Sequence, residues 1–290
     1  MTDSGTAVIG TGALGTAVAT TLMGAGHRVG VWNRTPARAD DLVARGASRC
    51  ASPVDAWASE LVLVCLTDYQ AATEVLRPLV DEAERTHEKT VVLLTTGTSA
   101  EAEVMHQLLT PCGVRYVAAG IQTAPDDIGS PRASFILSGS VAGFDEHRST
   151  LELLGNLTWL GADARAAAVW NLAMFGLWYD AQLGLLRAYE QVATVDVPAA
   201  EFASAAAQQL GHVVQATAAT AAEITASSYP RGPASLQEHL PVLQNLQDAR
   251  RRFRLGDGGL ADAERLVGEL VGTGHGDLGL TAIVDAELHP

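Results

Sequence analysis

A glycine-rich turn near the amino terminus constrains the fold more than any other feature of this sequence. Residues 6–9 form a β-rich run, and Gly10-Thr11-Gly12-Ala13-Leu14-Gly15 then fits G-x-G-x-x-G at the start of a helical stretch. The first glycine permits a tight turn, the second lets the backbone approach a pyrophosphate, and the third allows close packing of helix on strand. The free N–H groups of the helix N-terminus then face the phosphates. The turn therefore predicts a dinucleotide-binding domain.

The alternation of strands and helices that begins at this turn continues to about residue 160. Further β-rich runs lie at residues 28–32, 59–66, 90–94, 114–118 and 134–138. Beyond them the pattern is helical, with runs at residues 161–191, 200–224, 235–254 and 259–269. The predicted fold is α/β, with a doubly wound Rossmann sheet in residues 1–160, a long interdomain helix in 161–192 and an all-α domain in 193–290.

The residues after the second strand favour NADPH over NADH. An NAD enzyme places a carboxylate about 20 residues past the glycines, where it binds the ribose 2′-hydroxyl. This chain instead has Asn33, Arg34 and Thr35, followed by Arg38. Arg34 can pair with a 2′-phosphate through charge-assisted hydrogen bonds, and its two neighbours can add neutral ones. The alternative is a solvated turn with ordinary surface arginines.

Residues just past the strands are further cofactor candidates, because ligands of doubly wound sheets bind at the carboxyl ends of the strands. Residues 65–67, 95–96 and 120–123 occupy such places, and an ordinary loop is the alternative for each. The predicted cofactor-binding residues are Gly10, Gly12, Ala13, Leu14, Asn33, Arg34, Thr35, Arg38, Cys65, Leu66, Thr67, Thr95 and Thr96.

Charge and cysteine content argue against several classes of partner. The formal net charge is -14, whereas phosphate binding by nucleic-acid-binding proteins needs a basic surface. Cys50, Cys65 and Cys112 are widely spaced and match neither a metal site nor a disulfide framework. The N-terminus lacks the basic segment of a signal peptide. We therefore expect a reduced, cytoplasmic protein with no metal, no nucleic-acid partner and no membrane partner.

Lys89 is the only lysine of the chain. It lies in the polar lead-in to the strand at residues 90–94, where we expect a solvated side chain. Any mechanism that needs a lysine as acid, base or Schiff base would have to use this poorly placed residue.

The run at residues 161–191 combines helix formers with an uncharged middle, residues 166–178. As one helix it would extend about 45 Å. Asn171, Asp180 and Arg187 interrupt it, which argues against a membrane span. A helix that is apolar all round has to be covered on all sides, so we expect protein to cover it, in part from a second subunit.

Five stretches carry a family likeness: IGTGALG, GHRVGVWNRTPARADDLVARGA, TTGTSAEAE, APDDIGSPRASFILSGS and GTGHGDLGLTAI. Together they resemble the imine reductases, NADPH-dependent relatives of the β-hydroxyacid dehydrogenases. The resemblance covers nearly the whole chain and implies hydride transfer from NADPH to the C=N carbon of a small imine or iminium ion, cyclic imines in particular. It also implies a homodimer that exchanges the long helix, with each active site between one Rossmann domain and the other subunit's helices.

The long helix distinguishes the imine reductases from the hydroxyacid enzymes. The hydroxyacid enzymes use a lysine there as acid and base, and this chain has none beyond Lys89. Imine reductases carry a tyrosine or an aspartate near the middle of the helix, and Tyr179 matches the tyrosine form. Asn171 lies eight residues earlier, about 80° round the helix, so both side chains could border one pocket. Leu93 and Gln122 depart from the pattern, since relatives have an asparagine or an apolar residue there.

Tyr179 and Asn171 are the predicted catalytic residues. Tyr179 could hydrogen-bond the imine nitrogen or give it a proton, although an ordinary phenol with a pKa of about 10 is a weak acid at neutral pH. A hydrogen bond inside the core is the structural alternative for each, and Asp180 is expected to be structural. The predicted substrate-binding residues are Gln122, Met174, Phe175, Trp178, Leu183, His239 and Asn245.

Two other functions fit the same sequence. One is a β-hydroxyacid-type dehydrogenase with a non-lysine acid, which an assay with a hydroxy or oxo acid beside a cyclic imine would distinguish. The other is a catalytically silent NADPH-binding protein, in which Tyr179 and Asn171 are core residues.

Overall fold

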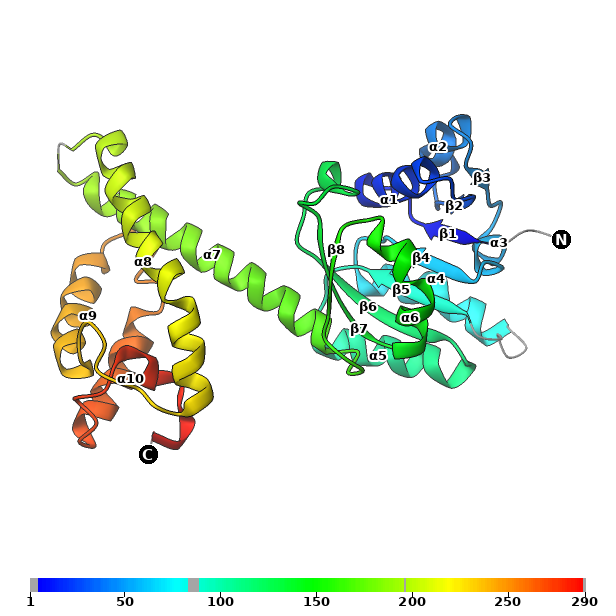
Figure 1. The fold of residues 1–290 in the computed structure, drawn as a ribbon. Helices are drawn as coiled ribbons and strands as arrows, with labels where there is room; N and C mark the ends of the chain where they lie inside the picture. Colours follow the sequence, from blue (N-terminus) through cyan, green and yellow to red (C-terminus); the bar gives the residue numbers. More distant parts are fainter. Residues whose placement is uncertain (1–4, 83–88, 196, 289–290) are drawn as a thin grey trace. The chain divides into compact units, whose positions relative to one another are not determined.

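The computed structural model describes residues 5–82, 89–195 and 197–288. The chain divides into two compact units, Met1–Phe175 and Gly176–Pro290. The first unit holds the sheet, and the second is helical (Figure 1). The predicted α/β fold with a helical C-terminal part is thus confirmed.

Strands of the described residues form one sheet in the first unit. They are β1 (Thr6–Ile9), β2 (Val29–Trp32), β3 (Ser48–Arg49), β4 (Leu61–Val64), β5 (Thr90–Leu94), β6 (Arg115–Ile121), β7 (Ser134–Gly139) and β8 (Asn156–Trp159). Their order across the sheet is β3-β2-β1-β4-β5-β6-β7-β8, and neighbours are parallel except β6 and β7. The order β3-β2-β1-β4-β5 is that of a doubly wound nucleotide-binding sheet, so the glycine turn follows a central strand.

Helices bury both faces of this sheet, which explains why its central strands are apolar on both sides. The helices on one face are α1 (Ala13–Gly24), α2 (Asp40–Ala44) and α6 (Val141–Glu152). Those on the other face are α3 (Pro53–Trp57), α4 (Tyr69–Glu82) and α5 (Ser99–Leu109), together with the first turn of α7 (Ala166–Val192). Thr98 and Glu101 fix the start of α5, because each side chain accepts a hydrogen bond from the other's backbone N–H.

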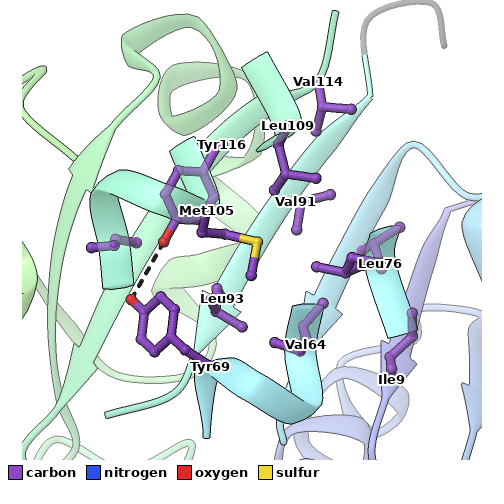
Figure 2. Close-up of a cluster of buried hydrophobic side chains, with 14 of the residues drawn as sticks. Ile9, Val64, Tyr69, Leu76, Val91, Leu93, Met105, Leu109, Val114 and Tyr116 are labelled. Atoms are coloured by element: carbon purple, nitrogen blue, oxygen red, sulfur yellow. Dashed lines mark hydrogen bonds between the residues drawn. The ribbon is translucent and has the colours of Figure 1, made fainter. Parts of the chain in front are cut away.

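Figure 2 shows the core between the sheet and helices α4 and α5. The hydroxyls of Tyr69 and Tyr116 meet there at 3.4 Å. Burial raises the pKa of both phenols, so both stay neutral. Leu93 is fully buried in this cluster, so its departure from the family pattern concerns the core.

The second unit contains the later part of α7 and three further long helices. They are α8 (Ala199–Ala226), α9 (Leu236–Arg250) and α10 (Leu260–Gly272). Its small core consists of Tyr229, Leu236, Val267, Leu270 and Ala282.

The middle of α7 is not covered by the described residues of the chain. Residues 172–182 are all exposed. The exposed fractions of Leu177, Trp178 and Tyr179 are 61%, 58% and 56%. Contiguous exposed apolar side chains of this kind mark an interaction surface.

Four elements of the first unit were missed by the sequence patterns: β3, α3, α6 and β8. Two strands and one helix are five residues or shorter, and periodicity needs a longer window to be visible. The fourth, α6, is charged on its outer side and buries only Gly143, Phe144 and Leu151. No helix within residues 5–82, 89–195 and 197–288 is both long and apolar enough to cross a membrane.

The expectation of a solvated Lys89 is wrong. The side chain lies in a buried position, 8% exposed, and Nζ donates to Ser59 O at 2.7 Å. Nζ also lies 5.2 Å from the centre of the Trp57 ring. Burial lowers the pKa of Lys89, and the nearby Glu60 carboxylate opposes this shift. The apolar stem of a lysine can pack in the core while its charged end finds a carbonyl, which a polarity pattern does not reveal.

Candidate functional site

The glycine turn has the shape of a pyrophosphate cradle. Gly10 has φ of 95° and donates its N–H to Trp32 O at 2.8 Å. A Cβ on Gly15 would lie 1.8 Å from Gly10 O, so only glycine lets α1 start this close to β1. A Cβ on Gly12 would meet nothing within 4 Å, and the Thr11 hydroxyl is buried without a partner among the described residues. Open space and an orphaned hydroxyl at a helix N-terminus fit a bound pyrophosphate.

Asn33 braces this turn. Its Oδ1 accepts from Thr11 N at 3.1 Å, and its Nδ2 donates to Thr35 O at 3.0 Å. Both ends of the amide are therefore in use within the protein. The Arg34 and Thr35 side chains next to it are exposed. These two side chains, rather than the Asn33 amide, are free to meet a phosphate.

A groove of about 670 Å³ opens at the same turn. It lies between α1 and the loop that follows β6, and its wall is formed by Thr11, Gly12, Ala13, Thr16, Ala17, Thr20, Thr21, Arg38, Pro125, Asp126 and Ile128. Arg38 places a cation in this wall, which suits an anionic ligand. Ala13 is the first residue of α1 and exposed, whereas Leu14 behind it is half-buried.

The carboxyl ends of β4 and β5 are tied together beside the turn. Thr95 Oγ1 donates to Leu66 O at 3.1 Å. Cys65 is buried beneath Gly10, and burial raises the pKa of its thiol to about 12, so the thiol stays protonated. Thr67 and Thr96 are exposed. Of these predicted cofactor residues, Thr67 and Thr96 present side chains to solvent, whereas Thr95 and Cys65 are buried.

Asn171 comes to the carboxyl ends of β5 and β6. It is only 1% exposed, and its Oδ1 accepts from Gln122 Nε2 at 2.5 Å. Its Nδ2 donates to Thr96 Oγ1 at 3.5 Å, a long bond of the kind that tightens when a ligand binds. Gly120 makes room for it, since a Cβ there would lie 2.7 Å from Asn171 Cβ. The structure thus brings together Gln122, Asn171 and Thr96, which the sequence had assigned to three different roles.

The start of α7 is anchored firmly enough to hold Asn171 in place. Ala167 N donates to the buried Ser138 Oγ at 3.0 Å, and Ala167 and Ala168 are buried against the sheet. The alanines have no bulk to keep the helix away from β6 and β7. Asn171, one turn later, is therefore directed at Gly120.

A second hollow of about 740 Å³ lies on a different side of α7. Its mostly apolar wall is formed by Ser99, Leu160, Asp163, Arg165, Ala166, Val169, Trp170, Ala173 and Met174. Met174 was predicted to line a pocket together with Phe175, but Phe175 is not in this wall and is 37% exposed. Val169 and Trp170 were not predicted, although they precede Ala173 and Met174 at helical spacing.

The remaining predicted residues belong to the second unit. Tyr179 and Trp178 contact each other edge to face, with ring centres 5.0 Å apart. Leu183 on α7 and His239 on α9 are half-buried, and Asn245 on α9 is exposed, as is Asp180. The described ranges contain no cluster of three or more side chains suited to a metal ion.

Two family models match successive parts of the chain. The family model of the NAD binding domain of 6-phosphogluconate dehydrogenase matches residues 6–161. The model of the NADPH-dependent reductive aminase-like C-terminal domain matches residues 163–287. An NADPH-dependent reductive aminase from Aspergillus oryzae is 31% identical over 284 residues, 96% of this chain and 95% of that protein. The chain belongs to the reductive aminase and imine reductase family.

Solved structures of the family have the same fold. A reductive aminase from Aspergillus terreus in complex with NADPH and ethyl levulinate is 31% identical with a TM-score of 0.84, covering 98% of this chain and 99% of that chain. An imine reductase from Bacillus cereus is 26% identical with a TM-score of 0.87, covering 97% and 98%. The resemblance found in the sequence is confirmed, and the chain is an oxidoreductase of this family.

Proposed function

We propose that the protein is an NADPH-dependent imine reductase that reduces the C=N bond of imines, cyclic imines in particular, to amines. The observation that carries the proposal is the uncharged cluster of Gln122, Asn171 and Thr96 at the carboxyl ends of β5 and β6, beside the glycine turn. This is where a doubly wound sheet binds its ligand. The relatives' activities, C=N reduction with NADPH, fit such a site.

The cofactor would be held by the glycine turn and the polar residues after β2. Gly12 and the N-terminus of α1 would face the pyrophosphate, and Arg34, Thr35 and Arg38 would bind the 2′-phosphate. NADPH supplies the hydride when bound. The protein's part is to hold the two reactants in register and to keep water away from them.

Tyr179 is the proposed acid or anchor for the imine nitrogen. Its hydroxyl makes no hydrogen bond within the described part of the chain, and its side chain is more than half exposed. A hydroxyl without a partner is free to bond a substrate nitrogen. Phe175, Trp178, Leu183, His239 and Asn245 are the proposed substrate-binding residues.

A homodimer with a shared α7 is the second part of the proposal. Residues 172–182 leave an apolar helix uncovered, and an obligate partner of the same sequence would bury it. The resulting roles are cofactor binding for residues 1–160, the shared helix for 161–192 and dimer formation for 193–290. Cytoplasmic location goes with the wide spacing of Cys50, Cys65 and Cys112, which matches no disulfide framework, and cell fractionation tests it.

The position of Lys89 weighs against the hydroxyacid alternative. The lysine precedes β5, whereas Thr96 follows it, so the two lie at opposite ends of this strand, about 20 Å apart. Its Nζ is committed to Ser59 O. It cannot serve as acid and base at the carboxyl ends of the strands.

Steady-state oxidation of NADPH tests the proposal. We expect turnover with 2-methyl-1-pyrroline and little or none with a 3-oxo acid, and little or no reduction of NADP⁺ by a 3-hydroxy acid; the reverse preference would establish the hydroxyacid alternative. Tyr179→Phe should lower kcat about 10- to 100-fold with little change in NADPH affinity. Tyr189→Phe is the matched control, since Tyr189 lies on the same helix and packs edge-on against Phe202. Equal rates for Tyr179→Phe and the wild type would remove the catalytic role of Tyr179.

A further inference from the structure

The hydrogen bonds around Asn171 have a direction that the protein itself sets. Gln122 Nε2 lies 2.5 Å from Asn171 Oδ1 and 3.4 Å from the Asn171 backbone oxygen. A backbone oxygen only accepts, so the end of the Gln122 amide that faces it has to be the NH₂ group. The same NH₂ group then requires an acceptor from the Asn171 side chain. Asn171 therefore presents Oδ1 to Gln122 and Nδ2 to Thr96.

The direction continues through Thr96. Asn171 Nδ2 can only donate, so Thr96 Oγ1 is the acceptor of their 3.5 Å contact. A hydroxyl that accepts in this way keeps its own hydrogen to donate. Thr96 is exposed, and its hydroxyl has no second partner among the described residues. The chain of bonds ends in a donor that is available to a ligand.

The cluster is also electrically neutral. Two amides and one hydroxyl carry no charge at any physiological pH. The hydrogen of the Thr96 hydroxyl can meet a ligand lone pair, whereas a charged N–H donor could use only the second lone pair of the same oxygen. The ligand group that fits is a neutral imine nitrogen or a carbonyl oxygen.

We propose that Thr96 recognises the reacting group by donating a hydrogen bond to a neutral imine nitrogen or carbonyl oxygen, and that Gln122 is a positioning residue that fixes this polarity through Asn171. The inference rests on the proposed function and reassigns two residues. Thr96, predicted as a cofactor residue, determines specificity, and Gln122, predicted to touch the substrate, acts through Asn171.

Ligand binding to the full-length protein loaded with NADP⁺ tests the role of Thr96. The probes are cyclohexanone, a neutral acceptor, and piperidine, which is protonated at pH 7.5, and calorimetry gives their affinities. Thr96→Val should weaken cyclohexanone binding about tenfold, and Thr96→Ser should restore it, since one hydrogen bond is lost and regained. NADP⁺ should bind as in the wild type, and piperidine should lose less affinity than cyclohexanone, because the proposed role of Thr96 is to donate. Unchanged cyclohexanone binding, or an equal loss for NADP⁺, would overturn the proposal.

A double-mutant cycle tests the role of Gln122. Gln122→Leu frees the Asn171 amide to turn its oxygen toward the Thr96 hydroxyl, which consumes the outward donor. We therefore expect about the same tenfold loss for cyclohexanone, and no further loss when Thr96→Val is added. Losses that multiply to about a hundredfold would show that Gln122 acts independently. Should Gln122→Leu misfold, Gln122→Met keeps the side-chain length and takes its place.

These binding measurements need no turnover, so they separate the two proposals. A protein that reduces no imine but shows the Thr96 and Gln122 effects would contradict the proposed reaction and keep the directed hydrogen bonds. If the wild type reduces imines and its Thr96→Val variant binds cyclohexanone as tightly as the wild type does, the proposed reaction is kept and the role of Thr96 is contradicted.

Discussion

Gly120→Ala is the substitution that tests the site geometry most directly. The added Cβ would lie 2.7 Å from Asn171 Cβ and 2.8 Å from its Cγ, about 0.7 Å short of ordinary contact. Asn171 cannot slide away freely, because Ala167 N is bonded to Ser138 Oγ and the first turn of α7 is buried. The strain has to be absorbed by rotating or lifting Asn171. Either movement lengthens the bonds to Gln122 and Thr96, and the Thr96 bond is already at 3.5 Å.

Two magnitudes follow from this overlap. A misplacement of about 1 Å near the reacting groups can cost a hundredfold in rate, so we expect kcat/KM for a cyclic imine to fall about 10- to 100-fold. Overpacking of this kind destabilises by about 1–3 kcal/mol, which in a unit of this size lowers Tm by about 2–12 °C. The Kd for NADPH should stay within about twofold, because the added methyl lies against Asn171 and not against the glycine turn.

The assay combines steady-state kinetics, differential scanning calorimetry and NADPH titration. Gly24→Ala is the matched control: it adds the same methyl group to the same unit, where it meets nothing within 4 Å. The control should keep wild-type activity. Wild-type kcat/KM in Gly120→Ala would refute the claim that Asn171 must sit on Gly120 for catalysis.

Three further predictions concern the cofactor, the core and the dimer. Arg34→Gln should weaken the binding of NADPH about 10- to 100-fold and leave the binding of NADH unchanged. Asn33→Ala loses the hydrogen bond that holds the glycine turn and should weaken the binding of both cofactors. Fluorescence titration with each cofactor distinguishes the two patterns. Burial lowers the pKa of Lys89, so between that pKa and the ordinary 10.5 the unfolded chain binds a proton that the folded chain does not, and the free energy of unfolding rises with pH. Urea titrations at pH 7.5 and 10 should show a smaller rise in Lys89→Met than in the wild type. An equal rise in both proteins would contradict this prediction. Leu177→Arg puts a charge on the exposed stretch of α7 and should convert the dimer to a monomer in sedimentation velocity. A wild-type protein that is already monomeric at micromolar concentration would contradict the proposed dimer.

The candidate site shows where sequence reasoning stopped. Asn171, Gln122 and Thr96 were each singled out, but as parts of a helix, a loop and another loop. They lie 49 and 75 positions apart in the chain, and only the adjacency of β5, β6 and α7 makes them one cluster. The sequence analysis did not predict the role of Gly120, whose lack of a side chain lets α7 approach β6. No pattern in a single sequence says which side chain will fill the space above a glycine.

The sequence alone determined the features that depend on neighbours in the chain. Strand, glycine turn and helix are adjacent residues, so their order predicted the Rossmann sheet, the cradle and the basic residues after β2. The count of one lysine needed no structure at all. The tertiary structure decided the rest: the burial of Lys89 against Trp57, the exposure of residues 172–182, and the direction of the hydrogen bonds that end at Thr96. Burial and hydrogen-bond polarity depend on groups that folding brings together from distant positions, and these are fixed by packing rather than by local pattern.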